Sequence, residues 1–110
     1  MRFLLIILLL PFSAYGLESD YQKAHCKGQM EFVLPDRTRV DCLTDTHAIE
    51  YDFGKKWAEA IGQSLHYAMW TGKRAGIVLI ISPSEIRFEK RVKAVINHYG
   101  LPIDVFTVPK

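Results

Sequence analysis

Short runs in which apolar and polar residues alternate occupy the middle of the chain. Residues 29–34, 38–43 and 48–53 show this alternation, and the turn-forming segments Pro35-Asp36-Arg37 and Thr44-Asp45-Thr46 separate them. Side chains on a strand point alternately to its two faces, so a period of two predicts strands. Three such strands joined by tight turns predict an antiparallel meander.

The second half of the chain changes to a helical period. Residues 55–71 carry apolar side chains at helical spacing, Met69 among them, and Gly72 supplies a stop. The continuous aliphatic run at 76–81 predicts a strand that is buried on both faces. Ser82-Pro83-Ser84-Glu85 has the pattern of a capping box. It predicts a second helix, with Tyr99 on the buried face and an end at Gly100, before a last strand at 103–108.

The predicted order of elements is α-β-β-β-α-β-α-β. Its first member is the polar segment 17–27, which has weak helical spacing and is predicted as a short helix or arm. A strand, a helix and a second strand imply a parallel crossover, so the sheet is expected to be mixed. Without repeats, low-complexity tracts or an internal linker, residues 17–110 predict one small α/β domain.

The first 16 residues have the features of a secretory signal. Arg2 precedes an uncharged apolar run, and Ala14 and Gly16 place small residues three and one before a cleavage site after Gly16. The apolar run is shorter than the roughly 20 residues that a membrane span needs. We therefore expect a cleaved signal peptide at 1–16, export to the periplasm or beyond, and no stable membrane insertion after cleavage. A retained N-terminal anchor is the alternative.

The net charge and the two cysteines bear on the possible partners and on the compartment of the protein. The chain has 14 basic and 12 acidic residues, so removal of Arg2 leaves 13 against 12, a net charge of +1. That balance gives no global field for nucleic acid, and an anionic partner would need a local cluster. Cys26 and Cys42 both lie in the exported part, where one disulfide is expected. Two buried free thiols are the alternative, and the spacing does not resemble a zinc site.

Three carboxylates stand out by their positions. Asp41 lies in the middle of a predicted strand, where aspartate is disfavoured, and Glu50 and Asp52 share a face of the next strand. If the hairpin places Asp41 opposite Glu50 or Asp52, three negative charges converge and at least one carboxylate takes up a proton. A bound Mg²⁺ or Mn²⁺ would relieve this repulsion, activate water and neutralise charge on a phosphoryl group.

The same carboxylates also fit an ordinary exposed sheet. On such a sheet Asp41 would pair with Arg37 or Arg39. Glu50 and Asp52 would then form the solvent side of an amphipathic strand. The alternation of residues alone does not separate this alternative from a metal site.

The order of these residues resembles the PD-(D/E)XK nuclease superfamily, which has the restriction-endonuclease-like fold. The resemblance rests on Asp41, then Glu50-Tyr51-Asp52 on the following strand, then a helix with Gln63 and Tyr67, and it covers roughly residues 29–82. Members share a βββαβ core and cut phosphodiester bonds with a divalent metal. The resemblance implies a restriction-endonuclease-like core for this chain, with nucleic acid, DNA above all, as its substrate.

The resemblance also implies roles for single residues. In that pattern the aspartate and the following acidic residue hold metal, which here are Asp41 and Glu50, with Asp52 as a further candidate. Gln63 resembles the extra glutamine of the exonuclease-like branches and would position substrate or water. An upstream acidic residue often completes the site, and Glu31 is the candidate.

The sequence departs from the superfamily pattern at one position. Asp52 stands where the pattern has its lysine, giving E-x-D in place of E-x-K. Some members carry the lysine on the next helix, where Lys55 and Lys56 are available, and we expect Lys56 because it lies on the same helical arc as Gln63. The resemblance thus predicts an exported metal-dependent nuclease. The alternative is a catalytically inactive nuclease-fold protein that binds a partner in the cell envelope.

Overall fold

The computed structural model describes residues 16–110, so the predicted signal segment lies outside the described residues except for Gly16. The elements follow the order α-β-β-β-α-β-α-β, as the sequence predicts, with a short 3₁₀ turn ahead of each of the two longer helices. They are α1 (Glu18–His25), β1 (Gln29–Val33), β2 (Arg39–Leu43), β3 (His47–Phe53), η1 (Gly54–Lys56), α2 (Trp57–Thr71), β4 (Arg74–Ile81), η2 (Pro83–Glu85), α3 (Ile86–Tyr99) and β5 (Ile103–Pro109).

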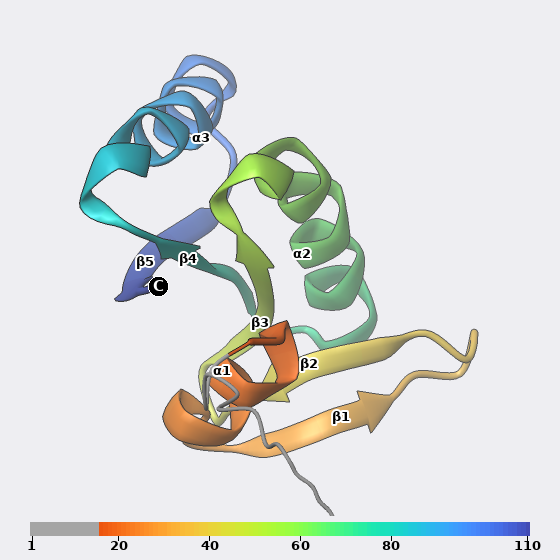
Figure 1. Ribbon diagram of the computed structural model, residues 1–110. Helices are drawn as coiled ribbons and strands as arrows, with labels where there is room; N and C mark the ends of the chain where they lie inside the picture. The colour runs from red at the N-terminus through yellow and green to blue at the C-terminus, as the bar shows by residue number, and fades with distance from the viewer. Residues whose placement is uncertain (1–15) are drawn as a thin grey trace, which may run out of the picture.

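The strands form one mixed five-stranded sheet in the order β1-β2-β3-β4-β5 (Figure 1). The first three strands pair antiparallel, β4 pairs parallel to β3, and β5 pairs parallel to β4. The meander and the parallel crossovers expected from the sequence are therefore confirmed. Strand β3 is the central strand of the five, and antiparallel pairing changes to parallel pairing at this strand.

The helices cover the two faces of this sheet unequally. Alternate β4 residues Ile77 and Leu79 pack into one core cluster with Val92 of α3 and with residues of α2. The β4 residues between them, Val78 and Ile80, pack with α1 on the opposite face. The result is a three-layer domain with two helices on one face and the short α1 on the other, and β4 is buried on both faces as predicted.

The helix ends follow the sequence signals. The backbone N–H and the hydroxyl of Ser82 donate to Oε1 of Glu85 over 2.9 and 3.1 Å, which is the predicted capping box. Gly72 and Gly100 end α2 and α3 in left-handed conformations with φ of 71° and 63°, which glycine adopts without strain. Met69 and Tyr99, predicted on buried faces, are 71% and 72% exposed, because helical spacing does not reveal how far the sheet extends beneath a last turn.

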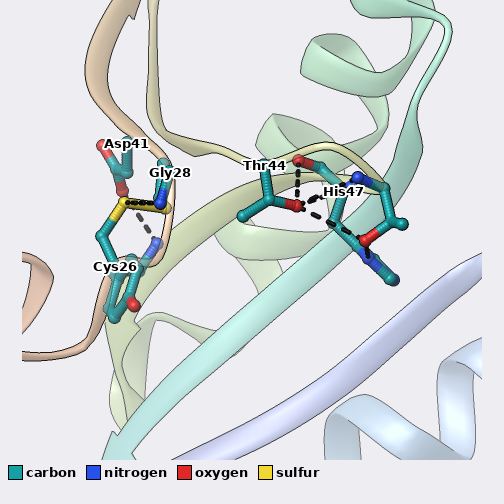
Figure 2. Close-up of a disulfide and its surroundings, with 8 residues drawn as sticks. Cys26, Gly28, Asp41, Thr44 and His47 are labelled. Atoms are coloured by element: carbon teal, nitrogen blue, oxygen red, sulfur yellow. Dashed lines mark hydrogen bonds between the residues drawn. A yellow bond between two sulfur atoms is a disulfide. The ribbon is translucent and has the colours of Figure 1, made fainter.

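The predicted disulfide is present between Cys26 and Cys42 (Figure 2). It joins the end of α1 to β2, and the backbone N–H of Gly28 donates to the sulfur of Cys26 over 3.3 Å. Glycine is required at position 28, since a Cβ atom there would clash with the backbone carbonyl oxygen of Leu43. The bond therefore fixes α1 against the sheet beside Asp41, the residue that precedes Cys42.

A disulfide of this kind is typical of proteins in oxidising compartments. Within residues 16–110, no helix is both long enough and apolar enough to cross a membrane.

Replacing both Cys26 and Cys42 by alanine is expected to lower the free energy of unfolding by about 3 kcal/mol. The unfolded variant regains the entropy of the loop that the bond closes over a sequence separation of 16. Urea denaturation without reductant measures the difference. Dithiothreitol should destabilise the wild type and leave the variant unchanged; equal sensitivity of the two proteins would contradict the prediction.

Candidate functional site

The two β3 carboxylates point into the protein. Glu50 and Asp52 are each only 3% exposed. Strand alternation places them on the same face as Ala48, which packs against Tyr67 of α2. They therefore lie between β3 and α2, and the alternative in which they form the solvent side of an amphipathic strand is wrong.

Asp41 reaches the same place from β2. In the β2–β3 pairing Cys42 lies opposite Ile49 and Leu43 opposite Ala48, and one further step of this register brings Asp41 beside Glu50. There Oδ2 of Asp41 accepts the backbone N–H of Tyr51 over 2.8 Å. The carboxyl groups of Asp41 and Glu50 are within hydrogen-bonding contact. The convergence of three carboxylates that the sequence predicted is thus found.

Two oxygen atoms in this cluster have no partner among the described residues. They are Oε1 of Glu50 and Oδ2 of Asp52, and both are buried. A buried acceptor without a partner is unfavourable, and almost all buried polar atoms in proteins are paired. These oxygens therefore require a proton or a cation beside them.

Burial and mutual repulsion dominate the electrostatics of the cluster. Burial, followed by the charge of Asp41, raises the pKa of Glu50 to about 11. Burial raises the pKa of Asp52 to about 7 and also raises the pKa of Asp41. The neighbours of Glu50 and Asp52 on β4 are Ile77 and Leu79, both fully buried, so the sheet offers no polar solvation on that side.

The carboxylates form the floor of an open cavity of about 620 Å³. We call this the acidic cavity; the residues that line it are Glu18, Asp41, Glu50, Asp52, Lys56, Glu59, Gly62 and Gln63. The structure therefore brings together Asp41, Glu50, Asp52, Lys56 and Gln63, all of them expected at the site from the sequence.

Lys56 lies at the rim of the acidic cavity. Its ammonium group is 3.3 Å from Oε2 of Glu18, and this pairing raises the pKa of Lys56. The same Glu18 oxygen accepts the backbone N–H of Phe53 at the end of β3 over 3.3 Å. Helix α1 packs on the other face of the sheet. Its first residue, Glu18, nevertheless contacts both the end of β3 and Lys56.

Glu31, the expected upstream acidic residue, does not line the acidic cavity. Its side chain is 42% exposed and lies 3.5 Å from Arg39, one of the two arginines that the exposed-sheet alternative offered to Asp41. Glu31 reaches Asp41 only through its charge, which contributes to the raised pKa of Asp41. Glu18 supplies the additional carboxylate in place of Glu31, because α1 folds back over the end of β3.

Sequence reasoning also missed Glu59 and Gly62 in the lining. For Glu59 a signal existed, because Lys56, Glu59 and Gln63 follow the three- and four-residue spacing of one helix face. For Glu18 no pattern in the sequence was available, since its position depends on how α1 docks.

The donor set fits a hard divalent cation with few protein ligands. Within residues 16–110, no three His, Cys, Asp or Glu side chains are already arranged to hold a metal ion. Mg²⁺ keeps several waters and commonly binds through one or two carboxylates together with substrate phosphates. The unpaired oxygens of Glu50 and Asp52, with the carboxylate of Asp41 beside them, supply such a set.

Comparison of the chain with protein-family models, curated proteins and solved structures finds no match. The functional argument therefore rests on the geometry of the acidic cavity.

Metal-free protein should lose stability as the pH rises. Below about pH 3 both Glu50 and Asp52 are protonated in the folded and in the unfolded chain, so they do not destabilise the fold. Above their ordinary pKa values of 4.5 and 3.8, the unfolded chain releases protons that the folded chain keeps until about pH 7 at Asp52 and about pH 11 at Glu50. From about pH 5 to about pH 8 we expect a loss of more than about 1.4 kcal/mol, measured by urea unfolding in EDTA.

Two variants test whether the carboxylate cluster causes this pH dependence of stability. Glu50→Gln mimics the protonated acid, so its profile should be flatter and its stability at about pH 8 higher than that of wild type. Glu89→Gln removes a carboxylate that pairs with Lys93 on α3 over 2.7 Å, and it should keep the wild-type slope. A wild-type slope in Glu50→Gln would assign the titration to other groups.

Proposed function

We propose that this protein is an exported, metal-dependent nuclease that hydrolyses phosphodiester bonds of DNA or another nucleic acid. The observation that carries the proposal is the pair of buried, unpartnered oxygens of Glu50 and Asp52 on the floor of a cavity with Lys56 at its rim. A buried cluster of like charges is costly for a fold unless a ligand uses it. Export is supported by the sequence of residues 1–16 and by the disulfide.

The arrangement of elements supports the resemblance to the PD-(D/E)XK superfamily. Strands β1, β2 and β3, helix α2 and strand β4 follow in the βββαβ order of that core. Asp41 on β2, Glu50 on β3 and Gln63 on α2 line one cavity, as the resemblance implies for residues that act together.

In this proposal some residues of the acidic cavity bind the metal ion and others position the substrate or the attacking water. Asp41, Glu50 and Asp52 would hold one divalent cation, with the N–H of Tyr51 orienting the carboxylate of Asp41. When bound, such a cation lowers the pKa of a coordinated water and neutralises charge on a phosphoryl group. Lys56 places an ammonium group at the rim to stabilise the attacking oxygen, and Gln63 offers an amide for substrate or water.

A specific observation also favours the second candidate, binding without turnover. The position that carries lysine in the superfamily pattern holds Asp52, and Lys56 is paired with Glu18 rather than free. A protein in which this pair never opens would take a cation and a partner in the envelope without cutting. The two candidates share metal binding and differ in hydrolysis.

Mg²⁺ or Mn²⁺ is expected to bind the wild type, to release protons on binding because the carboxylates must ionise, and to support cleavage that EDTA stops. Asp41→Asn keeps an acceptor for the Tyr51 N–H and removes the charge, so cleavage should fall at least about 100-fold. Calorimetry in two buffers of different ionisation enthalpy measures proton release, and a gel assay on single- and double-stranded DNA and RNA measures cleavage.

Asp45→Asn is the matched control. Asp45 lies exposed in the β2–β3 turn, where its backbone carbonyl, not its carboxylate, accepts the ammonium group of Lys73. Its variant should bind metal and cut as the wild type does. A wild type that neither binds a divalent cation nor cleaves any of these substrates would overturn the proposal, and binding without cleavage would select the second candidate.

Lys56→Met separates the two candidates at a single residue. The change removes the ammonium group and keeps the apolar stem, so we expect at least about a tenfold loss of kcat with Mg²⁺ affinity within about threefold of wild type. Lys55→Met, on the exposed neighbour that does not line the acidic cavity, should retain activity. Equal kcat values for the two variants would exclude Lys56 from the reaction.

A further inference from the structure

A second hollow of about 270 Å³ lies beside the acidic cavity. We call it the Thr38 pocket; the residues that line it are Thr38, Gly62, Gln63, His66 and Tyr67. Gly62 and Gln63 line both hollows, so the two adjoin across one face of α2. The two hollows are therefore neighbours, and they differ in the chemistry of their lining.

The Thr38 pocket presents hydrogen-bond donors where the acidic cavity presents carboxylates. The amide of Gln63 and the phenol of Tyr67 can donate to a ligand here, whereas the hydroxyl of Thr38 and Nε2 of His66 are already bonded to Asp36. Phosphate oxygens are acceptors, and about half or more of the hydrogen bonds between proteins and DNA go to phosphate and sugar. The pocket therefore suits a nucleotide next to one whose phosphate lies at the carboxylates.

The wall of the Thr38 pocket is held in place by a hydrogen-bond network. Nε2 of His66 lies 2.7 Å from Oδ2 of Asp36, and the Thr38 backbone N–H and hydroxyl donate to Oδ1 of Asp36 over 3.1 and 2.5 Å. The bond between His66 and Asp36 ties the turn of the β1–β2 hairpin to α2, two segments that are distant in sequence. The pocket is thus preformed rather than assembled by a ligand.

Gly62 lies where the two hollows meet, and the fold itself does not require glycine there. A Cβ atom at Gly62 would meet nothing within 4 Å, whereas one at Gly54 would lie 2.6 Å from the side chain of Ile81. Glycine in the interior of a helix is disfavoured relative to alanine. Packing therefore does not explain the glycine at position 62. We attribute it to the surface between the two hollows, which the absence of a side chain keeps open.

We propose that the two hollows act as one groove, which binds consecutive nucleotides of one nucleic-acid strand whose backbone crosses α2 over Gly62. The cleaved phosphodiester lies in the acidic cavity and the adjacent nucleotide in the Thr38 pocket. This inference rests on the proposed nuclease function and adds to it the path of the substrate. Gly62 acts as a specificity-determining residue that admits a polymer.

The test compares Gly62→Ala and Gly62→Leu on two substrates. The first is a short single-stranded oligonucleotide, which spans the groove, and the second is bis(p-nitrophenyl) phosphate, a single phosphodiester that needs only the acidic cavity. Gly62→Leu should raise the KM for the oligonucleotide at least about fivefold more than the KM for the small diester. Gly62→Ala should raise Tm by about 4 °C, which shows that the fold gains from losing this glycine.

Ala94→Leu, at an exposed position of α3, controls for the added apolar surface and should leave both KM values at wild type. If Gly62→Leu shifts both KM values equally, the groove is wrong while the nuclease function stands. If the wild type cuts neither substrate, the nuclease function fails, and anisotropy of a labelled oligonucleotide in Ca²⁺ decides the groove. Equal affinity of wild type and Gly62→Leu, or no binding by either, then overturns it.

Discussion

Burial of carboxylates at the centre of the sheet is the constraint on which the rest of this structure depends. Glu50 and Asp52 lie on the strand at which antiparallel pairing changes to parallel pairing, next to aliphatic neighbours on β4 that cannot solvate them. Desolvation and repulsion from Asp41 both oppose ionisation, so the folded protein without a ligand holds protons that these acids would normally release. Under the proposed function, a cation would replace those protons.

The elements around the cluster can be understood as support for it. Cys42 pairs with Met30 of β1 and with Ile49 of β3, and its disulfide adds a covalent link to α1 at the residue next to Asp41. The backbone N–H of Tyr51 then holds the Asp41 carboxylate in place of a carbonyl oxygen. Helix α1, stapled at Cys26, brings Glu18 to the strand end and so fixes Lys56 at the rim. A domain of this size thereby keeps an unfavourable cluster without losing its fold.

Much of the fold and the cluster could be predicted because both depend on local periods. Alternation predicted that Glu50 and Asp52 share a face and, if the hairpin paired accordingly, that Asp41 joins them. Lys56 and Gln63 were expected beside them from the resemblance to the nuclease superfamily. Whether that face was buried or solvated was left open, because an acidic residue on a strand has the same spacing in both cases. Only the docking of α2 over β3 decided it, and it also placed Gly62 between the two hollows.

Sequence by itself determined the order of elements and the helix ends at Gly72 and Gly100, because these follow from local backbone preferences. It also determined the cysteine pairing, because two cysteines allow only one disulfide within the chain. Tertiary structure alone decided that Glu18 and not Glu31 reaches the acidic cavity. Glu31 lies on an outer strand of the sheet and pairs with Arg39, while Glu18 arrives through the packing of α1 on the far face. Contacts between segments distant in the chain depend on how faces pack, and no local pattern encodes that.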